Sequence, residues 1–296
     1  MQKINKLIES AVSRRNFLVG AGSAAALTAV GCGSSGTKIT PTPTPTPAIT
    51  DTDILNFALN LEYLEASFYL IAATGTGLSA ADMGSGAGTV TGGSQVNFTS
   101  KIQQEYAYEI AQDELNHVRF LRSALGSAAV PMPAIDLVNS FNAAASAAGI
   151  GPTFNPFDNF NDFLLGAFIF EDVGVTAYTG AAPSITDKTI LSAAAGIQAV
   201  EAYHAGEIRT LIVAAGSTYI TLANKISTLR ATLGGGNETA LSATTIVAAD
   251  PTNAIAFART PQQVLDIVYA NASGTTATSG GFFPNGLNGT IKSTAA

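Results

Sequence analysis

The sequence is poor in cysteine, histidine and positive charge. Cys32 is its only cysteine, which excludes an internal disulfide framework and any zinc or iron–sulfur site built from several cysteines. Any chemistry that requires imidazole must use one of the two histidines, His117 and His204. Lysine and arginine together number 14 and the net charge is −7, so the chain lacks the cationic surface that nucleic acids require.

Apolar residues, by contrast, are abundant. Of the 296 residues, 47% are hydrophobic and 12% are charged, which is enough for a sizeable core in one large domain or two small ones. Tryptophan is absent, while alanine and leucine are frequent, and this composition favours helices.

Residues 1–32 resemble an export signal. Arg14 and Arg15 lie in a segment similar to a twin-arginine motif, and the apolar run that follows is too short to span a bilayer permanently. This run ends at Cys32, in a segment that resembles a lipoprotein cleavage box and implies acylation of that cysteine. An ordinary cleaved signal with a chance cysteine is the alternative. We expect an exported protein, periplasmic or at the cell surface, anchored to the membrane by lipid.

Residues 33–50 predict a linker. Threonine and proline alternate over residues 40–47, and alternating proline favours an extended polyproline II spacer. Such a spacer holds a folded domain away from a membrane or wall.

Residues 51–216 predict four long helices, from apolar residues at helical spacing and from glycine and proline at the ends. Asp51 or Thr52 is expected to cap the first helix. The helices are expected at about 52–73, 100–125, 158–179 and 186–215. A loop covers 74–98, and a proline-containing crossover covers 127–158, with a short helix near 134–148. A long crossover between two helix pairs predicts an all-α four-helix bundle.

Residues 217–296 predict a C-terminal extension of helices and loops. Helices are expected at about 221–233 and 261–270, the second of them starting with a Thr260–Gln263 capping box. The tail carries Phe282 and Phe283, two large apolar groups, so we expect this extension to pack on the bundle.

Both histidines follow a glutamate by three residues, in the pairs Glu114–His117 and Glu201–His204. Residues three apart lie on one face of a helix, where a carboxylate and an imidazole can bind one metal ion together. The chain has ten glutamates, so two such pairs are improbable by chance. The alternative is an ion-paired helix face at the surface.

The other two long helices carry a second matched pattern. Glu62 lies seven residues before Tyr69, and Glu171 lies seven residues before Tyr178, which places each tyrosine on the face of its glutamate. Glu65 is the alternative to Glu62. The tyrosines are either hydrogen-bonding or redox-active neighbours of a metal site, or ordinary core residues.

The two halves of the bundle resemble a duplicated hairpin, because Arg122 and Arg209 each follow a histidine by five residues. Two such hairpins would bring all the ligands to one central site. Four carboxylates and two imidazoles without thiolate suit iron or manganese, and four negative charges balance two divalent ions. Asp113, four residues before His117, either orients that ring or is solvated.

This ligand order resembles that of di-iron and di-manganese carboxylate bundles, with one Glu from each of two helices and Glu-x-x-His from each of the other two. The chain is similar to exported ferritin-like domain proteins, a group that includes the plant desiccation-related proteins. The resemblance implies two iron or two manganese ions with Glu62 and Glu171 as single ligands. It also implies that Glu114 and Glu201 are bridging or capping carboxylates and that His117 and His204 are terminal ligands.

The implied function is oxidation of Fe(II) or reduction of oxygen or peroxide in stress protection. A non-enzymatic desiccation or stress protein of the envelope, with a structural or vestigial metal site, is the alternative. A di-manganese, catalase-like activity is a third hypothesis. The expected partners are metal ions, oxygen or peroxide, and the membrane, with a homodimer left open. Without a rubredoxin-like cysteine domain, electron delivery as in rubrerythrin is not expected, and neither is a 24-subunit storage cage.

Overall fold

The structure is a computed structural model that describes residues 48–272 and 274–295. Arg14, Arg15 and Cys32 lie outside the described residues, as does almost all of the predicted linker. Helices predominate in the described part, where the two strands span two residues each. The predicted all-α class is therefore confirmed.

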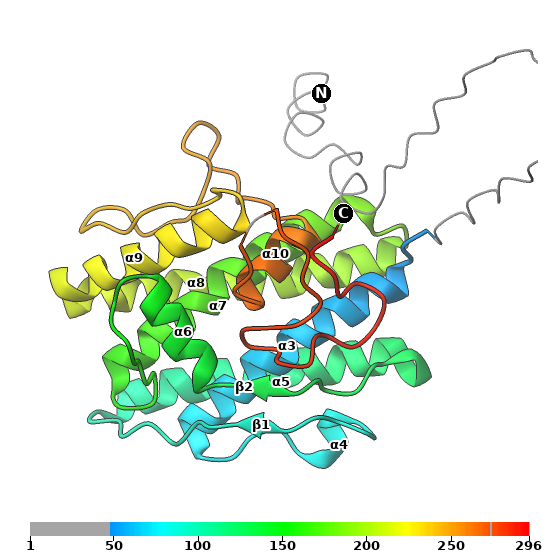
Figure 1. Cartoon of the computed structure of the whole chain (residues 1–296), viewed down its shortest axis with the longest axis horizontal. Helices are drawn as coiled ribbons and strands as arrows, with labels where there is room; N and C mark the ends of the chain where they lie inside the picture. The colour runs from blue at the N-terminus through cyan, green and yellow to red at the C-terminus, as the bar shows by residue number, and fades with distance from the viewer. Residues whose placement is uncertain (1–47, 273, 296) are drawn as a thin grey trace, which may run out of the picture.

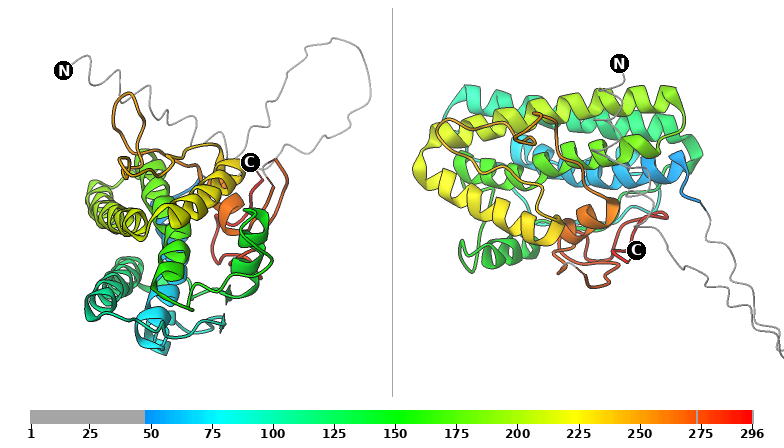
Figure 2. Two further views of the ribbon diagram at one scale, coloured as in Figure 1. Left: turned by 90° about the vertical axis from the view of Figure 1, so that its left-hand side faces the viewer. Right: turned by 90° about the horizontal axis from the view of Figure 1, so that it is seen from above.

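Four long helices form the body of the fold. α3 packs along α5, α7 packs along α8, and the two hairpins meet where α3 contacts α7. Figure 1 shows the helices aligned with the long axis, and the end-on view in Figure 2 places α3 and α7 in the middle, with α5 and α8 on one side. Their bounds are Asp51–Thr74 for α3, Lys101–Leu125 for α5, Phe160–Ala181 for α7 and Lys188–Ala215 for α8.

Side-chain caps explain where two of these helices begin. Thr50 forms a capping box with Asp53 at the start of α3, so the cap lies just before the Asp51 or Thr52 expected from the sequence. Asn159 caps α7 by accepting hydrogen bonds from the backbone N–H groups of Asn161 and Asp162. In both cases a side-chain oxygen accepts a hydrogen bond from backbone N–H groups that have no partner within the helix.

The connections between the long helices contain short elements that the sequence did not predict, apart from α6. They are α4 (Ala80–Met83), β1 (Val90–Thr91), η1 (Gly126–Ala128), β2 (Ile135–Asp136), α6 (Asn139–Ala147) and η2 (Ala182–Ser184). β1 pairs in parallel with β2 and so ties the α3–α5 loop to the crossover. Gly88 permits this close approach, because a Cβ there would lie 2.3 Å from the backbone nitrogen of Ala134.

The C-terminal extension contributes α9 (Ser217–Gly234) and α10 (Pro261–Val268). α9 packs against α7, α8 and α10, and begins four residues earlier than expected. The predicted Thr260–Gln263 capping box is present at the start of α10. Phe282 and Phe283 are buried at 4% and 0% exposure, so the tail helps to close the core.

α7 is the most apolar of the long helices and runs through the middle of the fold. The segment Phe160–Ser184 is long and apolar enough to cross a membrane, but 89% of its apolar window is buried inside the protein. This degree of burial is typical of a core helix.

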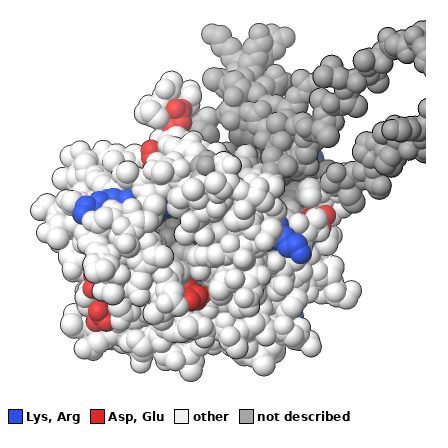
Figure 3. Space-filling view, viewed as in Figure 1, with Lys and Arg blue, Asp and Glu red and all other residues white. Residues whose placement is uncertain are grey.

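Charged side chains are sparse on the face of the molecule drawn in Figure 3.

Candidate metal centre

The structure brings all six predicted ligand residues into the interior of the bundle. Each long helix supplies its predicted element, a single Glu from α3 and α7 or a Glu-x-x-His pair from α5 and α8. None of the six residues is more than 8% exposed. They are Glu62, Glu114, His117, Glu171, Glu201 and His204.

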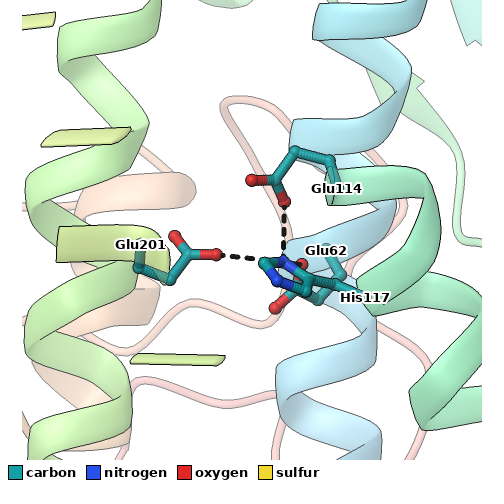
Figure 4. Close-up of side chains that lie close together, drawn as sticks. All are labelled: Glu62, Glu114, His117 and Glu201. Atoms are coloured by element: carbon teal, nitrogen blue, oxygen red, sulfur yellow. Dashed lines mark ion pairs between the residues drawn. The ribbon is translucent and has the colours of Figure 1, made fainter. Parts of the chain in front are cut away.

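The first group of ligand atoms surrounds the imidazole of His117 (Figure 4). Its Nδ1 lies 3.2 Å from Glu62 Oε2, 3.4 Å from Glu114 Oε2 and 3.3 Å from Glu201 Oε1. One donor atom from each of these four residues lies within 4.8 Å of every other. Three helices, α3, α5 and α8, therefore contribute to one small cluster that suits a single cation.

The second group surrounds the imidazole of His204. Its Nδ1 lies 2.9 Å from Glu114 Oε1 and 3.7 Å from Glu171 Oε2. Glu114 therefore presents one oxygen to each group, and the two imidazole rings are 6.3 Å apart between centroids. A carboxylate in this position is placed to bridge two cations. Glu201 joins the first group only.

Most of the converging atoms lack hydrogen bonds, although buried polar atoms in proteins are nearly always paired. The contacts around the two Nδ1 atoms are short but lack the alignment of hydrogen bonds. The unpaired buried atoms of the six residues are Glu62 Oε2, Glu114 Oε1 and Oε2, His117 Nδ1, Glu171 Oε2, Glu201 Oε1 and Oε2, and His204 Nδ1. Oxygen and imidazole nitrogen donors in this arrangement fit two iron or manganese ions.

The electrostatics of the site favour the binding of cations. Burial raises the pKa of Glu62 to about 7 and that of Glu171 to about 8, since the neighbouring imidazoles compensate only in part. Burial and repulsion from Glu114 raise the pKa of Glu201 well above its usual range. Burial also opposes ionisation of Glu114, but two imidazole neighbours hold its pKa below the usual range. Four buried carboxylates of this kind ionise together only if cations balance them.

The two predicted tyrosines contact the ligands, but each serves the opposite hairpin. The hydroxyl of Tyr69 on α3 donates a hydrogen bond to Glu171 Oε1 on α7, and that of Tyr178 on α7 donates to Glu62 Oε1 on α3. The sequence placed each tyrosine on the helix face of its own glutamate, and in the structure its hydroxyl bonds the glutamate of the facing helix. Each bond occupies one oxygen of a glutamate and leaves Oε2 directed at the cluster.

Asp113 is placed beside His204, although the sequence suggested His117. Its Oδ2 lies 3.3 Å from His204 Nε2, the ring nitrogen that points away from the ligand cluster. Carboxylates in this position orient a metal-binding imidazole and raise its basicity. The side chain of Asp113 is 42% exposed, so the carboxylate also meets solvent.

The repeated arginines reach matching positions in the two hairpins. Arg122 Nη1 donates a 2.6 Å hydrogen bond to the hydroxyl of Tyr63, the residue directly after Glu62. Arg209 Nη1 lies 2.8 Å from Oδ2 of Asp172, the residue directly after Glu171. These contacts fit the duplicated hairpin inferred from the sequence.

Asp172 also belongs to a buried ion network that the sequence did not predict. Its Oδ2 lies 2.7 Å from Arg230 Nη2, while Glu238 pairs with Arg230 at 2.7 Å and with Arg259 at 2.6 Å. The network joins α7, which carries a ligand, to the C-terminal extension. The sequence did contain a signal for this network, since Asp172 follows Glu171 within an apolar run. A buried carboxylate requires a partner, so a buried cation could have been expected.

A four-helix bundle with carboxylate and imidazole donors converging inside it has a ferritin-like architecture. The chain belongs to the ferritin-like domain family, which matches residues 50–214 and so includes all four ligand-bearing helices. It is 31% identical to desiccation-related protein PCC13-62 of Craterostigma plantagineum over 244 residues, covering 73% of this chain and 76% of that protein. It is 28% identical to ferritin-like catalase Nec2 of Nesocodon mauritianus over 268 residues, covering 81% of this chain and 84% of that protein.

Proposed function

We propose that this protein is a dimetal oxidoreductase that holds two manganese or two iron ions and converts peroxide. The observation that carries the proposal is the set of buried, unpaired ligand atoms from Glu62, Glu114, His117, Glu171, Glu201 and His204. A pair of redox-active ions held side by side supplies the two-electron chemistry that peroxide requires.

The chain's own residues bind and orient the ions. Glu114 reaches both ligand groups, so it fixes the spacing between them. The crossed hydrogen bonds from Tyr69 and Tyr178 fix the rotation of Glu171 and Glu62. Asp113 fixes the ring plane of His204. The apolar interior of the bundle excludes bulk water, which strengthens the attraction between carboxylates and cations.

Catalase chemistry is favoured over the other redox reactions for two reasons. One relative is named a ferritin-like catalase and aligns over most of both chains. Disproportionation of two peroxide molecules to water and oxygen also balances its own electrons and needs no external donor. This suits a chain whose single cysteine excludes an iron–sulfur cluster of its own. Oxidation of Fe(II) with oxygen as the acceptor is the neighbouring reaction.

The test combines elemental analysis with peroxide kinetics on the full-length protein. We expect about two manganese or iron ions per chain and oxygen release at one molecule per two peroxides consumed. A Glu114→Ala/His204→Ala double variant should lose both the bound metal and the release of oxygen. Oxygen consumption on addition of Fe(II), without release from peroxide, would favour ferroxidase activity. A protein that binds no metal would exclude the proposed enzyme.

A non-enzymatic stress protein is the second candidate, because the other relative is a desiccation-related protein of similar identity. In that case the ions only cross-link the helices. Metal-loaded protein would then melt at a higher temperature than metal-free protein, while peroxide would be stable in its presence.

We also propose that the protein acts outside the cytoplasm, as the twin-arginine-like segment at Arg14 and Arg15 and the lipobox-like Cys32 suggest. A Cys32→Ala variant should then be released from the membrane fraction, whereas an Arg14→Lys/Arg15→Lys variant should remain unexported. A lipid anchor would confine peroxide removal to the membrane surface.

A further inference from the structure

An apolar cavity of about 70 Å³ lies among α6, α7, α9, α10 and the C-terminal tail. None of the six candidate metal ligands lines it. α6 contributes alanines, whose small side chains leave this space unfilled. α9 contributes one face of the helix, since its lining residues are spaced by three or four positions. These residues are Ile226, Leu229, Arg230 and Leu233.

Two polar side chains line the cavity, and both have partners within the described part of the chain. The hydroxyl of Ser140 donates a hydrogen bond to the backbone carbonyl of Asp136. The guanidinium group of Arg230 pairs with Asp172 and with Glu238, at 2.7 Å in each case. Because this group is already bound, the aliphatic stem of the arginine is the part that suits an apolar wall. The lining therefore favours an apolar occupant.

The cavity opens to the surface between α6 and α10. Ala147, at the end of α6, and Ala270, just after α10, both line the cavity and are exposed. Figure 3 shows a hollow in the surface where α6, α9 and α10 meet. A ligand can therefore enter without unfolding of the core and can keep one end in solvent.

Lys225 on α9 supplies positive charge at the rim of the cavity. Its ammonium group donates a 2.6 Å hydrogen bond to the backbone carbonyl of Gly149. The residues that directly follow these two, Ile226 and Ile150, both line the cavity. The ion pairs between lysine or arginine and carboxylates of the described residues do not include Lys225. Its remaining N–H groups are therefore available to an anion.

We propose that this cavity binds a monomeric aliphatic carboxylic acid, with the end of the chain inside and the carboxylate on Lys225. An apolar cavity of about 150 Å³ holds benzene, so one of about 70 Å³ suits the end of an alkyl chain better than a ring. The ammonium group favours an anionic head over a neutral one. α9 and α10 lie outside residues 50–214, which match the family, so this site is separate from the ferritin-like core.

Isothermal titration calorimetry of the full-length protein with octanoate and octanol, each as monomers in solution, tests this assignment. Ala144→Leu fills the cavity from α6, and Lys225→Gln removes the charge while keeping a polar side chain of similar length. Ala195→Leu and Lys188→Gln are the matched controls, because both residues are exposed on α8 and neither lines the cavity. Circular dichroism checks that each variant folds.

We expect wild type and both controls to bind one octanoate per chain, and octanol about fivefold more weakly. Lys225→Gln should bind octanoate and octanol equally, because the charge that distinguishes them is gone. Ala144→Leu should weaken the binding of both by at least about tenfold.

Absence of octanoate binding to wild type would overturn the inference, as would unchanged affinity in a folded Ala144→Leu variant. Equal affinities of wild type for octanoate and octanol would overturn the role of Lys225. If Ala144→Leu fails to fold, the comparison of octanoate with octanol in wild type and Lys225→Gln still decides. The metal content of the protein affects none of these outcomes.

Discussion

Tyr178 on α7 donates a hydrogen bond to Glu62 on α3, so the two hairpins are joined at a ligand. The tyrosine hydroxyl contacts Oε1, while Oε2 of the same glutamate lies 3.2 Å from His117 Nδ1. The mirror-image bond from Tyr69 to Glu171 completes a crossed pair. Each hairpin therefore orients a ligand that the other hairpin supplies.

A Tyr178→Phe substitution should weaken metal binding about tenfold, because Glu62 loses the bond that fixes its rotation. Chelator competition measures this effect. Tyr203→Phe is the matched control, since Tyr203 lies on α8 and is 77% exposed. Equal affinities in the two variants would show that packing alone holds Glu62 in place.

The stability of the metal-free protein should fall as the pH rises from about 5 to 8. The folded-state pKa values of Glu62 and Glu171 are about 7 and about 8, above the ordinary 4.5. Protonation of these two carboxyl groups therefore stabilises the fold, and this contribution is fully present when the pH is below the ordinary pKa. It is lost as the pH rises through the raised pKa values of the folded protein. His204 acts in the same direction: burial opposes its protonation, but Glu171 and Glu114 raise its pKa to about 11.

Bound metal should remove this pH dependence, because the cations hold the same carboxylates ionised. Melting temperatures at pH 5 and pH 8, with and without manganese, measure the difference. The gap between the loaded and metal-free forms should widen towards pH 8. A metal-free melting temperature that rises across this window would contradict the assignment.

A Gly174→Ala substitution should weaken metal binding even though alanine is the better helix former. The new Cβ would lie 2.5 Å from Glu201 Oε2, so that ligand must move. Gly196→Ala on α8 is the control, since no atom lies within 4 Å of its added Cβ. The control should gain about 0.5–1 kcal/mol in free energy of unfolding and keep its metal affinity. Denaturant unfolding and metal titration separate the two effects.

An Asp172→Asn substitution should destabilise the fold by about 3–5 kcal/mol, because Arg209 loses its carboxylate partner and Arg230 keeps only Glu238. Arg119→Ala breaks the pair with Asp82, in which the arginine side chain is 54% exposed, and should cost less than about 1 kcal/mol. Urea unfolding of both variants measures the contrast. Similar losses in the two would mean that the buried network contributes no more than a surface ion pair.

The six converging residues could be singled out from the sequence because their signal is local. A spacing of three residues places Glu114 and His117 on one helix face, whatever the helix packs against. The order of four such elements along the chain then indicated a single centre between paired helices. The tyrosine spacing favoured Glu62 over Glu65, and one oxygen of Glu62 lies in the cluster around His117.

The features that were missed depend on distances between helices, which periodicity does not encode. The spacing of Tyr69 placed it on the face of Glu62, but the rotation of α3 against α7 decides that it meets Glu171. Asp113 lies four residues before His117 on α5, but the approach of α8 brings its carboxylate to His204 instead. The β1–β2 pairing spans two residues in each strand, too few to leave a pattern.

The buried arginines bear on the order of events during synthesis. α7 is the most apolar of the long helices and carries Asp172, whose partners Arg209 and Arg230 come from later segments. Arg230 shares Glu238 with Arg259, whose backbone nitrogen in turn donates to the carbonyl of Thr176 on α7. The central helix therefore gains its last polar contacts only after the segment that carries Arg259 has been synthesised and folded onto α7.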